Sequence, residues 1–133
     1  MAKALRITLT LMFAGLLTFI AFLVWSFHYG VSAEKTEFSS KAWKNSADIY
    51  AHSNDPGCIR GGMAIDILES ELLHGKSITE VKSLLGEPAL GTNALLSYEL
   101  GQCSGFGWHN TLLGVSFNSE GEFLSASIVP DFP

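Results

Sequence analysis

The residues of this chain that could carry chemistry are two cysteines, four histidines and a few carboxylates. Cys103 and His109 form a cysteine–histidine pair at short spacing. Such a pair could activate a thiolate nucleophile or supply ligands to zinc, but a structural zinc site needs about four ligands. We therefore expect no metal site, and we expect the histidines to lie at surfaces or interfaces.

Cys58 and Cys103 are the only cysteines, and both lie in glycine-containing segments outside the helices and strands predicted below. In an oxidising compartment two such cysteines most often form a disulfide. This one would close a loop of about 45 residues, and the chain-entropy model gives about 4 kcal/mol for that length. We predict a structural Cys58–Cys103 disulfide, with a metal or redox site and free thiols as the alternatives.

The other catalytic candidates lack a recognisable arrangement. Ser104 and Ser116 do not stand in the G-x-S-x-G pattern of a nucleophile elbow. Asp66, Glu69 and Glu71 could resemble paired carboxylates, but their spacing places them on the solvated face of a helix. We expect neither enzyme activity, nor a cofactor, nor a small-molecule substrate.

A glycine-rich segment, Gly101–Asn110, contains two large aromatic residues, Phe106 and Trp108. Loops carry function more often than the elements they connect, and aromatic side chains anchor many protein interfaces. We predict that Phe106, Trp108 and His109 contact a protein partner. In the alternative, Phe106 and Trp108 cover the end of the hydrophobic core.

The domain that positions these residues follows an uncharged run of 21 residues, Ile7–Phe27. A bilayer core of about 30 Å needs about 20 helical residues. Lys3 and Arg6 precede the run, so the positive-inside tendency predicts a cytoplasmic N-terminus and an exported remainder. Trp25 and Tyr29 would then lie near the outer interface. The pattern predicts a single-pass inner-membrane protein with a periplasmic C-terminal domain.

A cleavable signal peptide is the alternative interpretation of the same run. Val31-Ser32-Ala33 has the small residues of a cleavage site, and a cut there would leave Glu34 as the new N-terminus. The protein would then be periplasmic or secreted. The apolar region of a signal peptide is usually about 7–15 residues long, so the length favours an anchor. The first cysteine is Cys58, and the pattern therefore does not predict a lipoprotein.

From Glu34 onward the chain carries six basic and thirteen acidic residues, a net charge of about −7 with histidine neutral. Such a surface repels phosphate groups and anionic lipid headgroups. We therefore expect neither a nucleic acid partner nor peripheral binding to a membrane surface.

The chain divides into residues 1–33 as anchor or signal segment, residues 34–57 as a polar linker, and residues 58–133 as one domain. The linker has only three large aromatic residues, Phe38, Trp43 and Tyr50. It is predicted to be a loosely ordered stalk with a short helical stretch around Ser40–Ala51. The turn pattern Asp55-Pro56-Gly57 closes it.

The domain is predicted to be α+β, with two helices on one face of a three-stranded antiparallel sheet. The first helix covers Gly62–Leu73, where apolar residues recur at helical spacing. The second has a capping box at Ser77-Ile78-Thr79-Glu80 and ends at Gly86, before Pro88. The predicted strands are Ala94–Leu100, Thr111–Phe117 and Glu122–Val129, the last two joined by a hairpin turn at residues 118–121.

These patterns together resemble a known family. The sequence Gly75-x-Ser77-x-x-x-Val81-x-x-x-x-Gly86-x-Pro88, an aromatic strand ending near Tyr98, and Leu113-x-Val115-x-Phe117-Asn118-x-x-Gly121 are similar to the SmpA/OmlA (BamE-like) family of small outer-membrane assembly lipoproteins. The resemblance covers about residues 62–129.

The resemblance implies the ααβββ module that is also seen in β-lactamase inhibitor proteins, acting through protein contacts and not through catalysis. Two features differ from the assembly lipoproteins: a lipidation cysteine does not follow the apolar run, and two internal cysteines are present. The sequence thus predicts a non-catalytic, membrane-tethered protein-interaction module of the cell envelope. The alternative is an inhibitor or immunity-like protein released by cleavage after Ala33.

Overall fold

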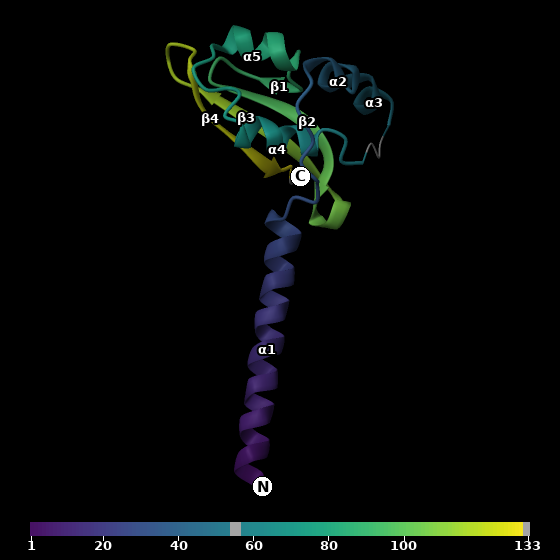
Figure 1. The fold of residues 1–133 in the computed structure, drawn as a ribbon, viewed down its shortest axis with the longest axis vertical. Helices are drawn as coiled ribbons and strands as arrows, with labels where there is room; N and C mark the ends of the chain where they lie inside the picture. Colours follow the sequence, from purple (N-terminus) through teal and green to yellow (C-terminus); the bar gives the residue numbers. More distant parts are fainter. Residues whose placement is uncertain (54–56, 132–133) are drawn as a thin grey trace.

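The computed structural model describes residues 1–53 and 57–131, and for residues 50 and 51 the backbone alone. One long helix, α1, projects from the base of an α+β domain (Figure 1). The domain contains a four-stranded antiparallel sheet in the order β1-β2-β3-β4. The elements are α1 (Ala2–Tyr29), α2 (Ser40–Asn45), α3 (Ala47–His52), α4 (Gly61–Glu69), α5 (Ile78–Leu85), β1 (Leu90–Gly91), β2 (Leu95–Ser104), the 3₁₀ turn η1 (Gly105–Gly107), β3 (His109–Phe117) and β4 (Phe123–Pro130).

Helix α1 is long and apolar enough to cross a membrane, and none of its 28 residues, all of them described, is buried. Its threonines are satisfied within the helix. The hydroxyl groups of Thr8, Thr10 and Thr18 each donate to the carbonyl oxygen four residues earlier. A helix in hydrocarbon must satisfy its polar groups internally, and α1 does so at these positions.

The core lies between one face of the sheet and the helices. Strand alternation sends Leu96, Tyr98 and Leu100 of β2 to the same face, where they meet Val81 and Leu85 of α5. Tyr98 donates its hydroxyl to the Gly86 carbonyl oxygen at 3.2 Å. Burial, with a contribution from the nearby charge of Glu87, raises the pKa of Tyr98 to about 12.

Helix α5 has the predicted start and end. The Ser77 hydroxyl accepts from the Glu80 amide at 3.3 Å, and the Glu80 carboxylate accepts from the Ser77 amide at 2.8 Å. The same amide and the Ser77 hydroxyl lower the pKa of Glu80. Gly86, with φ of +80°, ends the helix in a conformation that favours glycine. The capping box and the helix Ile78–Leu85 are therefore confirmed.

The α+β class is confirmed, but the predicted counts of helices and strands were too low. A fourth strand, β1, pairs Leu90 with Ser97 and Gly91 with Leu96. Two residues are too few to show the alternation by which a strand is predicted. The first predicted helix ends earlier, at Glu69, because Glu71 adopts a φ of +53° that an α-helix cannot continue.

The segment between β2 and β3 is shorter than the predicted loop Gly101–Asn110. Strand β2 continues to Ser104 and β3 begins at His109, so that only η1 connects them. Register shifts at Gly101 interrupt the pairing. A Cβ at Gly101, whose φ is +88°, would lie 1.8 Å from the Gly57 carbonyl oxygen. The missing side chain lets the chain beside Cys58 approach the strand.

The predicted linker is not a stalk, because residues 34–46 pack onto the domain. Trp43 of α2 is completely buried, and its ring centroid lies 6.3 Å from that of Tyr98. The Arg60 guanidinium lies over the Trp43 ring at 4.9 Å and donates to the Trp43 carbonyl oxygen at 2.8 Å. The helical stretch predicted around Ser40–Ala51 is present as α2 and α3. Of the predicted turn, Asp55 and Pro56 lie outside the described residues.

Candidate functional site

The two cysteines form the predicted disulfide. The Sγ atoms of Cys58 and Cys103 are 2.09 Å apart, and the Cys103 side chain is buried. The bond occupies the thiol that a Cys103–His109 nucleophile would need. Within the described ranges, His, Cys, Asp and Glu side chains nowhere gather in groups of three or more that could hold a metal ion.

The three carboxylates of the α4 region do not form one site. Asp66 accepts the Phe38 amide at 2.9 Å and pairs with Lys35 at 3.2 Å, while Glu69 binds Lys35 at 2.8 Å. The Phe38 amide and then Lys35 lower the pKa of Asp66, and the two carboxylates raise the pKa of Lys35. The prediction that Asp66 lies on a solvated face was therefore wrong. Its side chain is only 18% exposed because the chain before α2 covers it.

Residues 30–38, which we call the connector, join α1 to the domain and are held by backbone hydrogen bonds. The Ser32 amide donates to the Cys103 carbonyl oxygen at 2.6 Å, and the Thr36 amide to that of Gly62 at 3.1 Å. A Cβ at Gly62 would lie 2.3 Å from the Glu34 carbonyl oxygen, and one at Gly61 would lie against the disulfide and 3.0 Å from the Ala33 Cβ. The two glycines thus leave the space in which the connector docks.

The predicted partner-binding residues share one turn, residues 105–109, which we call the aromatic loop. The loop lies at the base of the domain, beside the C-terminal end of α1 (Figure 1). Phe106 is 55% exposed and Trp108 80% exposed, so neither covers the end of the core. The ring of Phe27, in the last turn of α1, lies 5.4 Å from that of Phe106 and 4.7 Å from that of His109.

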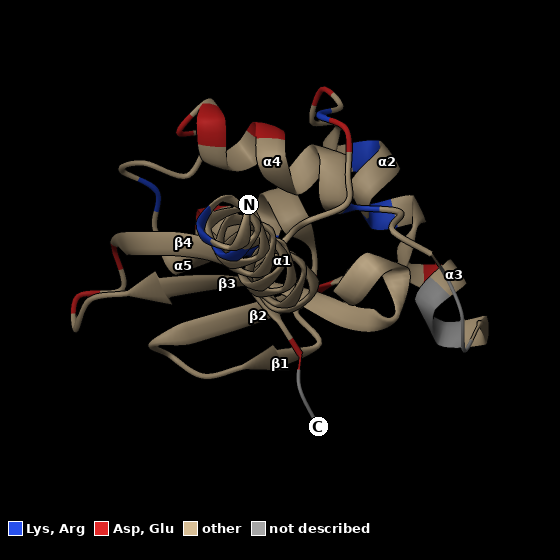
Figure 2. Ribbon diagram, turned by 90° about the horizontal axis from the view of Figure 1, so that it is seen from below, with Lys and Arg blue, Asp and Glu red and all other residues tan. Residues whose placement is uncertain are grey.

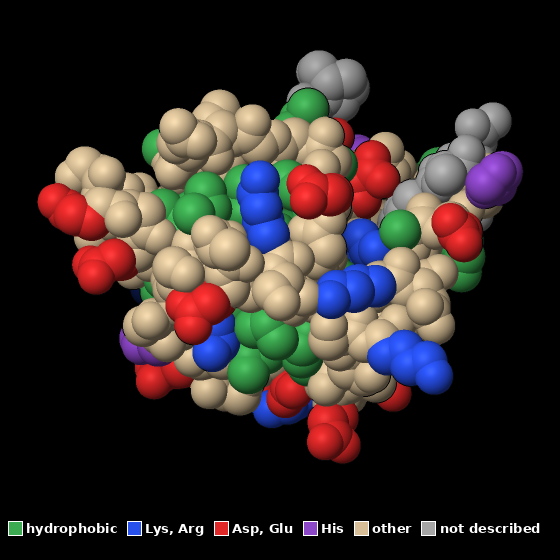
Figure 3. Space-filling view, turned by 90° about the horizontal axis from the view of Figure 1, so that it is seen from above, with side chains coloured by type: hydrophobic (Ala, Val, Ile, Leu, Met, Phe, Trp, Pro, Cys, Tyr) green, Lys and Arg blue, Asp and Glu red, His purple; other side chains and the backbone are tan. Residues whose placement is uncertain are grey.

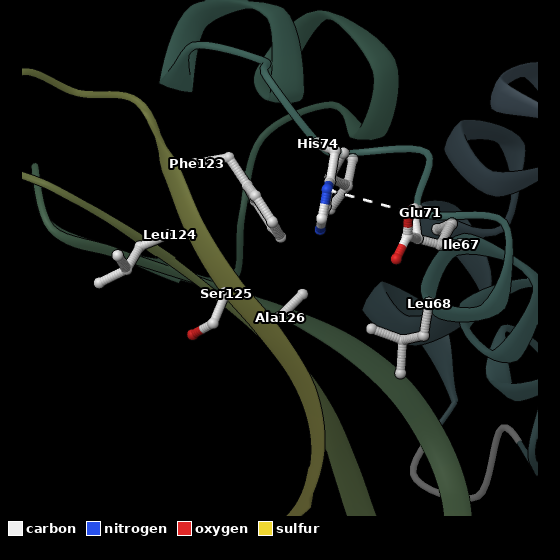
Figure 4. Close-up of a pocket in the computed structure, with 9 residues that line it drawn as sticks. Ile67, Leu68, Glu71, His74, Phe123, Leu124, Ser125 and Ala126 are labelled. Atoms are coloured by element: carbon white, nitrogen blue, oxygen red, sulfur yellow. Dashed lines mark ion pairs between the residues drawn. The ribbon is translucent and has the colours of Figure 1, made fainter.

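A second candidate site is a cleft of about 230 Å³ between α4, the turn after it and β4, with both polar and apolar side chains in its lining. Its lining residues are Ile67, Leu68, Glu71, Leu73, His74, Phe123, Leu124, Ser125 and Ala126. Figure 4 shows the side chains of Leu68, His74, Phe123 and Ala126 directed into this space. The His74 ring lies 5.3 Å from the Phe123 ring, and His74 Nδ1 lies 4.0 Å from a Glu71 carboxylate oxygen.

The cleft adjoins the open edge of the sheet, because β4 is the last strand. The Asp131 amide donates to the Asn110 carbonyl oxygen on the β3 side at 2.8 Å. Amides alternate in direction along an antiparallel strand, so those of Ile128 and Ala126 point away from β3. No backbone hydrogen bond between described residues outside the sheet ladder uses these two amides.

Charge is spread unevenly over the molecule. Seen from the side of α1, the acidic residues lie around the periphery of the domain, while Lys3 and Arg6 lie at the far end of α1 (Figure 2). On the opposite face, basic and acidic side chains are interspersed and hydrophobic side chains show only as small patches (Figure 3).

Sequence reasoning located the aromatic loop through its composition, but it missed the cleft and the docked connector. The cleft depends on the direction in which the chain leaves α4 after Glu69. The docking of the connector depends on a close approach between its backbone and that of α4. The adjacent glycines Gly61 and Gly62 were the available indication of that approach. Comparison of the chain with protein-family models, with curated proteins and with solved structures found no match.

Proposed function

We propose that this protein is a single-pass inner-membrane protein whose BamE-like periplasmic domain binds a protein partner and performs no catalysis. One observation carries the proposal: an apolar helix of 28 residues, none of them buried, is joined to a folded domain through a docked connector. Lys3 and Arg6 at the free end of that helix favour a cytoplasmic N-terminus.

The exposed surface of α1 supports a bilayer as its surroundings. Within residues 16–25, five leucine, phenylalanine and tryptophan side chains are each more than half exposed: Leu16, Leu17, Phe19, Phe22 and Trp25. Contiguous apolar surface of this kind is unfavourable in water by about 25 cal/mol per Å². The uncharged run Ile7–Phe27, at about 1.5 Å per residue, is about 31 Å long and matches a hydrocarbon core of about 30 Å.

The alternative, release by cleavage after Ala33, would cut the connector. In the folded protein the Ser32 amide donates a hydrogen bond to the Cys103 carbonyl oxygen. The Ala33 Cβ packs close to Gly61, 3.0 Å from where a Cβ on that glycine would lie. A peptidase would have to act before these contacts form. The docked connector therefore favours a retained anchor.

For the partner we propose an extended protein segment that adds to the edge of β4 and places one large apolar side chain in the cleft. Strand addition uses unpaired edge amides for affinity and a neighbouring pocket for specificity, and β4 offers both. Glu71 at the cleft and Glu122 just before β4 are two of the acidic residues behind the net charge of about −7. These charges favour a segment flanked by basic residues.

Site-specific photo-crosslinking in cells tests this site. A photoreactive residue at His74, which points into the cleft, is expected to capture one discrete protein, whereas the same residue at Thr79 on the exposed side of α5 is not. Ala126→Pro removes an outward amide that β3 does not use, so it is expected to abolish the adduct while the disulfide still forms. Equal capture from both positions, or an adduct that survives Ala126→Pro, contradicts the proposed site.

A further inference from the structure

We propose that the aromatic loop is a second membrane contact, which inserts Phe106 and Trp108 into the outer interface of the bilayer that α1 spans. The inference rests on the proposed membrane tether. The lipid interface, and not the protein partner that the sequence predicts, is then the neighbour of these side chains.

The depth of the loop follows from its contact with α1. Phe27 is the last residue of the uncharged run, so a run that fills the hydrocarbon core places Phe27 at its outer boundary. The Phe106 ring centroid lies 5.4 Å from that of Phe27. An interfacial region is several ångströms deep on each side of the core, and Phe106 therefore lies within it.

The composition of the loop suits that depth. Residues 101–110 contain no Asp, Glu, Lys or Arg, although the domain as a whole is acidic. Aromatic rings, tryptophan above all, are enriched at the headgroup level because they combine an apolar body with a polar edge. Trp25 and Tyr29 of α1, 58% and 67% exposed, lie at the same end of the helix. The contact is thus aromatic, and it does not depend on attraction to anionic lipid.

The backbone holds the two side chains outward. Gly105, Phe106 and Gly107 all have positive φ, and the Trp108 amide donates to the Gly105 carbonyl oxygen at 3.1 Å. A Cβ at Gly105 would lie 2.5 Å from His109 Nδ1, so the turn packs directly against the His109 ring. The loop therefore has a fixed shape, and its two largest side chains remain exposed. The loop itself lies on the side of the domain that bears α1 (Figure 1).

Tryptophan fluorescence of the full chain in phosphatidylcholine vesicles tests the inference. Trp25→Phe leaves Trp108 and the buried Trp43 as emitters, Trp108→Phe leaves Trp25 and Trp43, and the double variant gives the Trp43 background. Vesicles whose acyl chains carry bromine near the carbonyl end or near the chain middle report depth. Aqueous iodide reports exposure to water.

We expect bromine near the carbonyl end of the acyl chains to quench Trp108 emission at least as strongly as Trp25 emission. We also expect Trp108 to be protected from quenching by iodide. Quenching of Trp108 by iodide and not by bromine, while Trp25 is quenched by bromine, overturns the membrane contact and leaves the tether standing. If bromine quenches neither residue, α1 is not inserted, and the tether and the contact are both wrong.

Discussion

The amide of Ser32 donates a hydrogen bond of 2.6 Å to the carbonyl oxygen of Cys103. This bond joins the chain that leaves α1 to the strand that carries the disulfide. Together with the bonds from Thr36 to Gly62 and from Phe38 to Asp66, it makes the connector part of the folded domain. The domain is therefore held in one position relative to the end of α1 and does not hang on a flexible stalk.

The docking of the connector depends on Gly62. A Cβ there would lie 2.3 Å from the Glu34 carbonyl oxygen, a backbone atom that cannot rotate away. Overpacking of this kind costs about 1–3 kcal/mol. We expect Gly62→Ala to lower the free energy of unfolding by about that amount and to speed proteolysis within residues 32–38. Urea unfolding and limited proteolysis of the full chain in detergent measure the two effects.

Gly114→Ala is the matched control, because the nearest atom to its Cβ would be 3.8 Å away and its φ needs no glycine. We expect it to leave the connector resistant to protease. Equal proteolysis of the two variants would mean that the docking does not depend on Gly62.

Two tryptophans separate core packing from surface exposure. Trp43 is completely buried and Trp108 is 80% exposed. Truncation of a buried tryptophan costs about 3–5 kcal/mol, whereas exposed substitutions usually stay within about 0.5 kcal/mol. We expect Trp43→Ala to destabilise the protein by the larger amount and Trp108→Ala by the smaller. A Trp43→Ala variant as stable as the parent protein would show that residues 34–46 are a linker after all.

The disulfide is expected to contribute mainly by restricting the unfolded chain. Cys58 and Cys103 are 45 residues apart, and the chain-entropy model gives up to about 4 kcal/mol for such a loop. We expect the double variant Cys58→Ala/Cys103→Ala to unfold at lower urea concentration. The reductant that destabilises the parent protein should leave this variant unchanged. If reductant also destabilised the double variant, its effect on the stability of the parent protein would not come from this disulfide alone.

Acid should weaken the attachment of the connector to α4. The Phe38 amide, and after it Lys35, hold the pKa of Asp66 below its usual value. A group with a lowered folded pKa stabilises the folded state above its unfolded pKa, here about 3.9, and the contribution is lost as the pH falls through the folded value. We expect Asp66→Asn to be less stable than the parent protein at neutral pH and to lose less stability below about pH 4.

Glu69→Gln is the control for Asp66→Asn, because Glu69 shares Lys35 but does not accept the Phe38 amide. Exposed ion pairs contribute about 0–1 kcal/mol, so its effect should be smaller. If both variants had the same pH profile, the hydrogen bond from the Phe38 amide to Asp66 would not be the cause of the loss of stability in acid.

Local sequence patterns predicted several elements closely. Helix α5 has both of its ends encoded in Ser77, Glu80 and Gly86, and the hairpin at residues 118–121 joins β3 and β4 as expected. These features depend on hydrogen bonds between residues a few positions apart. The disulfide could be predicted as well, since only two cysteines are present.

The features that the sequence did not predict depend on contacts between distant residues. Trp43 enters the core by packing on Tyr98 and Arg60, so the polar composition around it was misleading. The aromatic loop could be identified as unusual, but its position beside Phe27 follows only from the docked connector. Tertiary packing overrides local pattern at these places.

The central claim is that α1 stays attached and holds the domain at the membrane. Intact mass spectrometry of the protein extracted from the membrane fraction tests it most directly, after an alkaline wash that removes peripheral proteins. We expect a chain that still contains residues 1–33, together with a mass lower by two hydrogens for the Cys58–Cys103 bond. A mature chain that begins at Glu34 and is recovered from the soluble fraction would contradict the account.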